Sequence, residues 1–164
     1  MLQKITPHLW FDNNAEEAMK FYTSVFKNSK IVSINRYPDE SLDEHFKGMA
    51  GKVIHGIFEL NGQRFMALDG GPMFKFNEAI SLYVQCESQE EVDYFWDKLT
   101  ADGGEESMCG WLKDKYGLSW QIVPRQLDEL MGDKDPEKTG RVMQALMQMK
   151  KIDIEGLKQA YEQG

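Results

Sequence analysis

The chain has 164 residues, enough for one domain or for two small modules that share a core, and 41% of them are hydrophobic, as packed globular proteins require. A formal net charge of −8 and the lack of a Lys/Arg cluster argue against nucleic acid as a partner, because phosphate binding depends on cations. No apolar run approaches the ~20 residues of a membrane span, and the start does not resemble a signal peptide. Cys86 and Cys109 lack CxxC spacing, so we expect reduced thiols in a cytoplasmic protein.

The first half of the chain predicts one helix among four strands. Alternating apolar and polar residues predict a strand over 5–11. Asn14 precedes Glu17 at the spacing of a capping box, which predicts a helix over 15–26. Asn61-Gly62 is a strong hairpin signal, because both residue types tolerate positive φ. Further strands are predicted over 30–37, 52–60 and 63–69, with a polar loop over 38–51.

The second half repeats this order. QEEVDYFWDKLT (89–100) aligns with AEEAMKFYTSVF (15–26) at an offset of 74 residues, and Ser88 with Glu91 repeats the capping-box spacing. Strands are predicted before this helix over 79–86, and after it over 105–109, 111–114 and 119–124. The sequence therefore predicts a duplication in which each module has the order βαβββ.

Two short helices are predicted in the remaining residues, 125–164. Asp135 and Pro136 form an N-cap followed by a first-turn proline. Asp153 caps the second helix, where Ile152 and Leu157 have the spacing of a hydrophobic staple. An apolar stripe on the first helix includes Val142, Met143, Leu146, Met147 and Met149. We expect these helices to pack on the sheet, the alternative being a partner surface.

Tandem βαβββ modules resemble the vicinal oxygen chelate superfamily of glyoxalase I, bleomycin-resistance proteins and extradiol dioxygenases. The stretches NAEEAMKFYTSVF, FMALDGGP, CGWLKDKYGLSWQIVP and PEKTGRVMQALMQMKKIDI resemble its PhnB-like group, many members of which carry the label 3-demethylubiquinone-9 3-methyltransferase domain. The resemblance implies an α+β fold with a curved mixed sheet, a ligand-sized cavity and pairing as a homodimer. It implies a glyoxalase-like domain over 1–124, with modules at about 1–75 and 76–124, and a helical extension over 125–164.

Strand alternation assigns one face of each strand to the helices and the other to the cavity. The residues expected in the core are Leu9, Phe11, Ile54, Phe58, Leu60, Met66, Leu68, Ile80, Leu82, Val84, Trp120 and Ile122. The residues expected to line a ligand-binding cavity are His8, Trp10, His55, Glu59, Phe65, Asp69, Ser81, Tyr83, Trp111 and Gln121. Such a mixture of aromatic and polar groups is typical of small-molecule sites. The alternative is that these side chains fill a collapsed barrel.

In the metal-dependent members, four strands each supply one ligand. The resemblance transfers these positions to His8 (or Pro7), Ala67, Ala79 and Gln121. The last is carried by DKYGLSWQI, which matches an Asp-x-x-Gly-x-x-x-Glu pattern with Gln121 in the Glu place. Alanine has no donor atom, and a neutral amide is a poor ligand for a divalent ion. We therefore expect no metal, the alternative being a rearranged site built from His8, His55, Glu59 and Gln121.

Three functions remain open. The leading interpretation is a metal-independent and cofactor-free protein that binds a small aromatic or amphipathic molecule, with no catalytic residues assigned. The second is a glyoxalase- or dioxygenase-type enzyme with rearranged metal ligands. The third is the methyltransferase that the group's label names. Its cofactor usually lies on a Gly-rich turn after the first strand of a doubly wound sheet, whereas here FDNNAEEA follows the first strand, and Gly70-Gly71 and Gly103-Gly104 open no strand-to-helix crossover.

Overall fold

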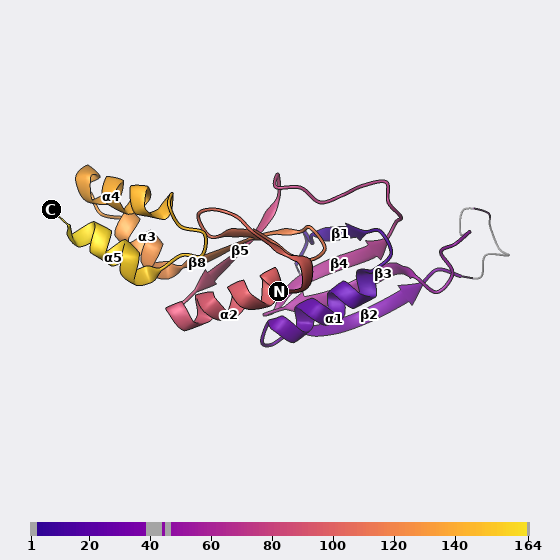
Figure 1. The fold of residues 1–164 in the computed structure, drawn as a ribbon. Helices are drawn as coiled ribbons and strands as arrows, with labels where there is room; N and C mark the ends of the chain where they lie inside the picture. The colour runs from indigo at the N-terminus through magenta and orange to yellow at the C-terminus, as the bar shows by residue number, and fades with distance from the viewer. Residues whose placement is uncertain (1–2, 39–43, 45–46, 164) are drawn as a thin grey trace. The chain divides into compact units, whose positions relative to one another are not determined.

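A computed structural model describes residues 3–38, 44 and 47–163. Half of the predicted loop over 38–51 lies outside these residues. The chain divides into two compact units, residues 1–75 and 76–164 (Figure 1). No helix in the described part of the chain combines the length and apolar character that crossing a membrane would require.

The first unit is one βαβββ module. Its elements are β1 (His8–Phe11), α1 (Ala15–Val25), β2 (Lys30–Arg36), β3 (Val53–Leu60) and β4 (Gln63–Asp69). The strands form a four-stranded sheet in the order β1-β4-β3-β2, in which β1 runs parallel to β4 and the other pairs are antiparallel. Asn61 and Gly62 have φ of 49° and 82° at the β3–β4 hairpin, as their sequence predicts.

The second unit repeats the module and adds a tail. Its repeated elements are β5 (Ser81–Cys86), α2 (Gln89–Thr100), β6 (Glu105–Glu106), β7 (Trp111–Lys113) and β8 (Ser119–Pro124), with a short 3₁₀ turn, η3 (Ala101–Gly103), after α2. The strand order β5-β8-β7-β6 reproduces that of the first sheet, and β5 is again parallel to β8. The predicted α+β class and the βαβββ order of both modules are confirmed.

The two equivalent helices begin in different ways. The Ser88 hydroxyl accepts a hydrogen bond from the Glu91 backbone N–H at 3.2 Å, as the capping box predicts. The helix α1 is present, but its predicted cap is wrong, because the Asn14 side chain makes no capping hydrogen bond. Asp69, at the end of β4, takes that role instead and accepts the Ala15 N–H at 2.9 Å.

Asp69 joins three parts of the first unit. One carboxylate oxygen binds the start of α1, and the other accepts the Val53 N–H at the start of β3, at 2.9 Å. Its backbone carbonyl accepts the Tyr37 hydroxyl at 2.9 Å. The residue is 2% exposed. A buried carboxylate that accepts two backbone N–H groups holds the helix, the hairpin and the strand end together.

Each module buries one sheet face beneath its helix. In the first unit α1 packs on β3 and β4, and Phe58 stacks between Tyr22 and Phe65, with ring centroids 6.3 and 5.4 Å away. In the second unit α2 packs on β7 and β8 and covers Leu112, Trp120 and Ile122, all buried. These apolar faces account for the stability of each module, because burial of apolar surface is the main driving force of folding.

The tail over residues 125–163 contains three helices: α3 (Arg125–Met131), α4 (Pro136–Leu146) and α5 (Ile154–Glu162). Two were predicted, and the prediction missed α3, a seven-residue helix that directly follows β8. The predicted caps are confirmed, because Asp135 accepts the Glu137 N–H and Asp153 accepts the Glu155 N–H. A shared cluster buries Val123, Val142, Leu146, Ile152 and Leu157.

Backbone hydrogen bonds also attach the tail to the second sheet. The Cys109 and Gly110 N–H groups donate to the Met149 and Lys150 carbonyls, both at 2.8 Å. The Gln89 side chain, at the start of α2, donates to the Ile152 carbonyl at 3.0 Å and accepts the Ile154 N–H at 2.8 Å. Satisfied backbone groups and a shared core fix the tail firmly to its module.

Candidate functional site

The face of the first sheet that lies opposite α1, which we call the first open face, carries polar and aromatic side chains. His8, Met66 and Ile57 lie side by side on β1, β4 and β3, because His8 pairs with Met66 and Met66 pairs with Ile57. Trp10 lies beside Leu68 in the next row. His55 and Glu59 extend this face along β3, as strand alternation predicts. Most of these side chains are half-buried, while His8 is exposed.

Two histidines meet on this face. The His8 and His55 rings are 5.9 Å apart between centroids and nearly perpendicular. Partial burial, and then the neighbouring His55 charge, lower the pKa of His8. Both effects disfavour the imidazolium, so His8 loses its proton at a lower pH than a fully solvated histidine does. Glu59 forms an ion pair with Arg64, whose guanidinium lies 3.5 Å from the Glu59 carboxylate.

The glycines after β4 hold Trp10 in place. The Trp10 indole N–H donates to the Gly71 carbonyl at 3.0 Å, and its ring meets the edge of Phe74 at 4.8 Å between centroids. A Cβ atom at Gly70 would lie 2.2 Å from the Trp10 ring. Glycine is therefore required at position 70 for close packing, so FMALDGGP has a structural role in the first unit.

The prediction that Phe65 and Asp69 line the cavity is wrong. The alternation on β4 is opposite to the prediction: Phe65, Ala67 and Asp69 are buried on the side of α1, while Met66 and Leu68 lie on the first open face. The physical reason is that Phe65 stacks on Phe58 and that Asp69 binds the start of α1. Both residues belong to the folding core.

The second sheet has an equivalent face opposite α2, which we call the second open face. Tyr83, Gln121 and Trp111 form one row across β5, β8 and β7, because Gln121 pairs with both neighbours. Ser81, Ser119 and Lys113 form the adjacent row. Tyr83 is 50% exposed, and Trp111 and Gln121 are half-buried. The structure thus brings four predicted site residues, Ser81, Tyr83, Trp111 and Gln121, onto one surface.

Hydrogen bonding on this face is incomplete. The Gln121 amide donates to the Ser81 hydroxyl at 2.9 Å. The Ser119 hydroxyl is buried, with the residue 1% exposed, and finds no partner in the described part of the chain. Burial, and then the nearby Asp128 and Cys86 charges, raise the pKa of Tyr83. Ser119 was not among the predicted site residues, although alternation with Trp120 had placed it on this face.

Two other core predictions, those for Ile54 and Ile80, are also wrong. Ile54 is exposed because the alternation shifts beside it, where the β2–β3 register is irregular between Asn35 and Arg36. Ile80 precedes β5 and is 74% exposed. Val123 lies on the alternation of Gln121, but the tail helices cover it, and it belongs to their shared cluster. The tail therefore closes one end of the second open face.

The donor atoms available near the predicted metal positions do not suit a divalent ion. The parallel registers place Met66 beside His8 and Tyr83 beside Gln121, so Ala67 and Ala79 are not the residues that face His8 and Gln121. A thioether, a phenol and a neutral amide are weak ligands for Zn²⁺, Mn²⁺ or Mg²⁺. Within the described residues, no three His, Cys, Asp or Glu side chains are grouped so that they could hold a metal.

Divalent ions should therefore leave the protein's melting temperature unchanged. We expect a shift below about 1 °C on addition of Ni²⁺, Zn²⁺, Mn²⁺ or Fe²⁺ to the metal-free chain, measured by differential scanning fluorimetry. An ion at about 100 times its dissociation constant would instead add about 2.7 kcal/mol, a shift on the order of 5 °C. A stoichiometric metal in the purified protein, detected by elemental analysis, would contradict this prediction and direct attention to His8, His55 and Glu59.

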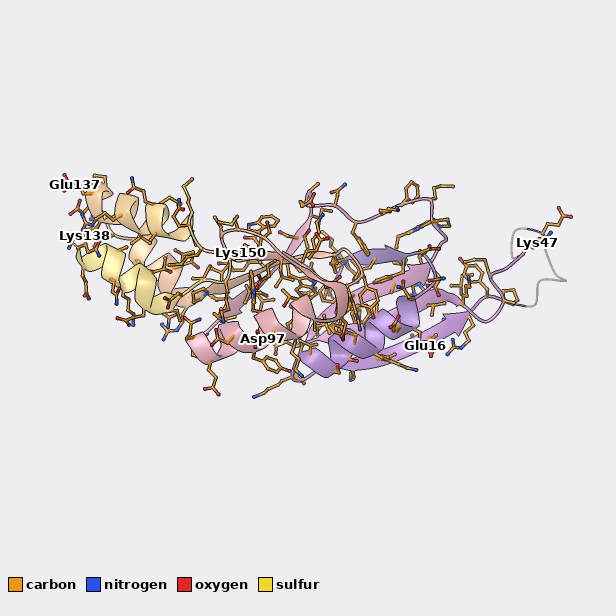
Figure 2. The ribbon with its side chains drawn as sticks, in the orientation of Figure 1. Glu16, Lys47, Asp97, Glu137, Lys138 and Lys150 are labelled. Carbon is orange, nitrogen blue, oxygen red and sulfur yellow. The ribbon has the colours of Figure 1, made fainter. Side chains whose placement is uncertain are left out.

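A separate hollow of about 230 Å³ lies in the first unit beside the start of α1. Its walls include Glu16 and Arg36, which are paired with each other at 2.7 Å, together with Lys52 and the buried Asp69. Figure 2 labels Glu16 on α1. This hollow is small and charged, and it contains none of the aromatic residues that ligand pockets usually present.

The two sheets define a protein of tandem βαβββ modules in which each module covers one sheet face with a helix. A family model described as 3-demethylubiquinone-9 3-methyltransferase matches residues 3–123, and the chain belongs to this family. The resemblance to the PhnB-like group is thereby confirmed. None of the curated proteins compared with the chain matches it.

Solved structures include a similar protein from Bacillus cereus, described as a putative 3-demethylubiquinone-9 3-methyltransferase, PhnB protein. It is 48% identical, with a TM-score of 0.65, over 74% of this chain and 99% of that one. A Pseudomonas aeruginosa protein is 20% identical, with a TM-score of 0.59, over 76% and 98% of the two chains, which supports the fold alone. The fosfomycin resistance protein FosX from Listeria monocytogenes is 16% identical, with a TM-score of 0.49, over 73% and 91%.

Proposed function

We propose that this protein binds a small aromatic or amphipathic molecule on its open sheet faces without using a metal ion. The observation that carries the proposal is the row of Tyr83, Gln121 and Trp111, which lies opposite the helix-covered face and keeps two large rings partly accessible. Rings flanking an amide give the combination of apolar area and a few polar groups by which small-molecule sites orient their ligands.

The first open face supports the same proposal. Trp10 is fixed by its hydrogen bond to Gly71 and by Phe74, so its ring keeps one orientation. A rigid ring loses little conformational entropy when a ligand binds. The His8 and His55 rings lie 5.9 Å apart between centroids, and the lowered pKa of His8 favours a neutral hydrogen-bonding imidazole at position 8. We propose both faces as ligand-contacting surfaces, with Phe65 and Asp69 removed from the predicted set.

The family's description favours methyl transfer as a second candidate. For that reaction S-adenosylmethionine would have to bind, and two of the four clustered glycines have packing roles instead. Gly70 is required by the Trp10 ring, and Gly104 approaches the backbone of Thr100 at the end of α2. The β1–α1 connection contains Asn13 and Asn14 in place of glycine. These roles favour ligand binding over methyl transfer.

A thermal-shift screen separates the candidates. Quinones, phenols and thiol conjugates should include ligands that raise the melting temperature by several degrees, on the order of 5 °C at saturation, whereas S-adenosylmethionine should produce neither a shift nor heat in calorimetry. Trp111→Ala should abolish the shifts caused by ligands that bind the second open face. Tyr94→Ala is the matched control, because Tyr94 lies exposed on α2. Heat on titration with S-adenosylmethionine would favour methyl transfer. A screen in which no compound raises the melting temperature would contradict the proposal.

We also propose that the chain pairs as a homodimer, as the superfamily resemblance implies. Met143 on α4 and Met147 at its C-cap are 40% and 57% exposed, whereas Val142 and Leu146 of the same helix enter the tail core. Flexible thioethers adapt well to a partner surface. Sedimentation velocity at micromolar concentration should give a species of twice the 19.0 kDa chain mass. A monomer alone at that concentration would exclude the dimer.

A further inference from the structure

The second open face contains a polar corner next to its aromatic row. Ser119 lies between Ser81 on β5 and Lys113 on β7, its direct partners in the two registers. Side chains of directly paired strand residues lie about 5 Å apart on one face. Two serine side chains and one lysine side chain therefore form the row next to Gln121, whose amide already donates to the Ser81 hydroxyl at 2.9 Å.

Ser119 indicates that this corner is incomplete without a ligand. Its hydroxyl is buried and has no hydrogen-bond partner in the described residues. An unpaired buried hydroxyl costs about 1–3 kcal/mol, so native proteins usually satisfy it with protein, water or ligand atoms. Trp120 and Ile122, which alternate with it on β8, are packed in the core.

Lys113 supplies the charge at this corner. Its ammonium pairs with the Glu78 carboxylate, which is 60% exposed and precedes β5. The hydrogen bond with Glu78 raises the pKa of Lys113, and an ordinary lysine is already cationic at neutral pH without that partner. An exposed ion pair contributes little stability. A ligand anion that also receives hydrogen bonds from serine hydroxyls can therefore replace Glu78 at low cost.

From this juxtaposition, and resting on the proposed function, we infer that the ligand is an aromatic carboxylate. Its carboxylate would bind Lys113 and Ser119, and its ring would lie along Trp111 and Tyr83. Charge-assisted hydrogen bonds are the strongest of the available polar contacts. The protein's net charge of −8 repels anions in general, so a preference for an acid over its neutral amide requires a local site of this kind.

The test compares 2-naphthoate with 2-naphthamide by isothermal titration calorimetry on the full chain. The acid should bind about tenfold more tightly than the amide, the equivalent of one charge-assisted hydrogen bond. Lys113→Met should remove this preference while leaving naphthamide affinity within about twofold. Ser119→Ala should weaken naphthoate about tenfold without lowering the melting temperature, because it removes an unpaired buried hydroxyl.

Two further variants make the test specific. Glu78→Gln should strengthen naphthoate binding, because it removes the competing carboxylate from Lys113. Lys115→Met removes the same charge from the adjacent turn, where Lys115 lies over the Tyr116 ring, and should leave the preference intact. Equal binding of acid and amide, or a preference that survives Lys113→Met, would overturn the inference and leave the proposed function standing. Absence of binding by both probes would also overturn it, and the broader ligand screen would then decide the proposed function separately.

Discussion

Asp69→Ala should lower the free energy of unfolding by about 3–5 kcal/mol, measured by urea denaturation. The variant leaves the Ala15 and Val53 N–H groups buried without an acceptor, and each such group costs about 1–3 kcal/mol. The melting temperature should fall by roughly 10 °C for a chain of this size. Asp69→Asn should recover no more than half of the loss, because one oxygen becomes a donor that faces an N–H group.

Two controls identify the source of this effect. Asp12→Ala removes an exposed carboxylate from the same β1–α1 connection and should change stability by less than about 0.5 kcal/mol. Asn14→Ala should also be nearly neutral, because the Asn14 side chain caps nothing. A cost for Asn14→Ala equal to that for Asp69→Ala would mean that the helix is capped by Asn14, as the sequence pattern had indicated.

Asp114→Ala should have a comparable effect in the second unit, about 4 kcal/mol. The Asp114 carboxylate is 2% exposed and accepts three hydrogen bonds, from the Tyr116 and Leu118 N–H groups at 2.9 and 3.1 Å and from the Trp120 indole at 2.8 Å. Loss of this acceptor leaves three donors unsatisfied in and beside a tight turn. The turn and the indole orientation should both be disturbed, which near-ultraviolet circular dichroism would detect.

A double-mutant cycle tests the indole contact. Trp120→Phe removes one donor while retaining a ring in the core, so combining it with Asp114→Ala should cost less than the sum of the two single changes. Lys115→Ala in the same turn should stay within about 0.5 kcal/mol of the parent. Additive effects of Asp114→Ala and Trp120→Phe would contradict a direct role for the hydrogen bond.

The success of sequence reasoning depended on how clearly each strand distinguishes its two faces. On β8, polar Ser119 and Gln121 alternate with Trp120 and Ile122, and the predicted faces are those of the structure. On β4, apolar residues occupy both faces, so composition alone could not choose between them. Long-range contacts determine which face of β4 is buried, because Phe65 stacks on Phe58 and Asp69 accepts a hydrogen bond at the start of α1. Such contacts are absent from a local pattern.

A local pattern failed in the same way at the start of α1. Ser88 and Asn14 precede equivalent helices at equivalent spacings, yet Ser88 caps its helix while a residue 54 positions away from Ala15 in sequence replaces Asn14. The orphaned Ser119 hydroxyl could be placed on a face from sequence, but its lack of a partner depends on the neighbouring strands. The duplicated order of elements was recoverable because each strand and helix carries its own periodicity.

The tail core restricts which side chains fit at position 123. The family match ends at residue 123, and Val123 is itself part of the cluster that Val142, Leu146, Ile152 and Leu157 complete. The region shared with the family therefore stops inside a hydrophobic core, near the end of β8. The side chains that pack against residue 123 in this cluster belong to the tail and lie outside the shared region. The packing of Val123 therefore depends on the tail helices, although only residue 123 lies within the stretch that the family model matches.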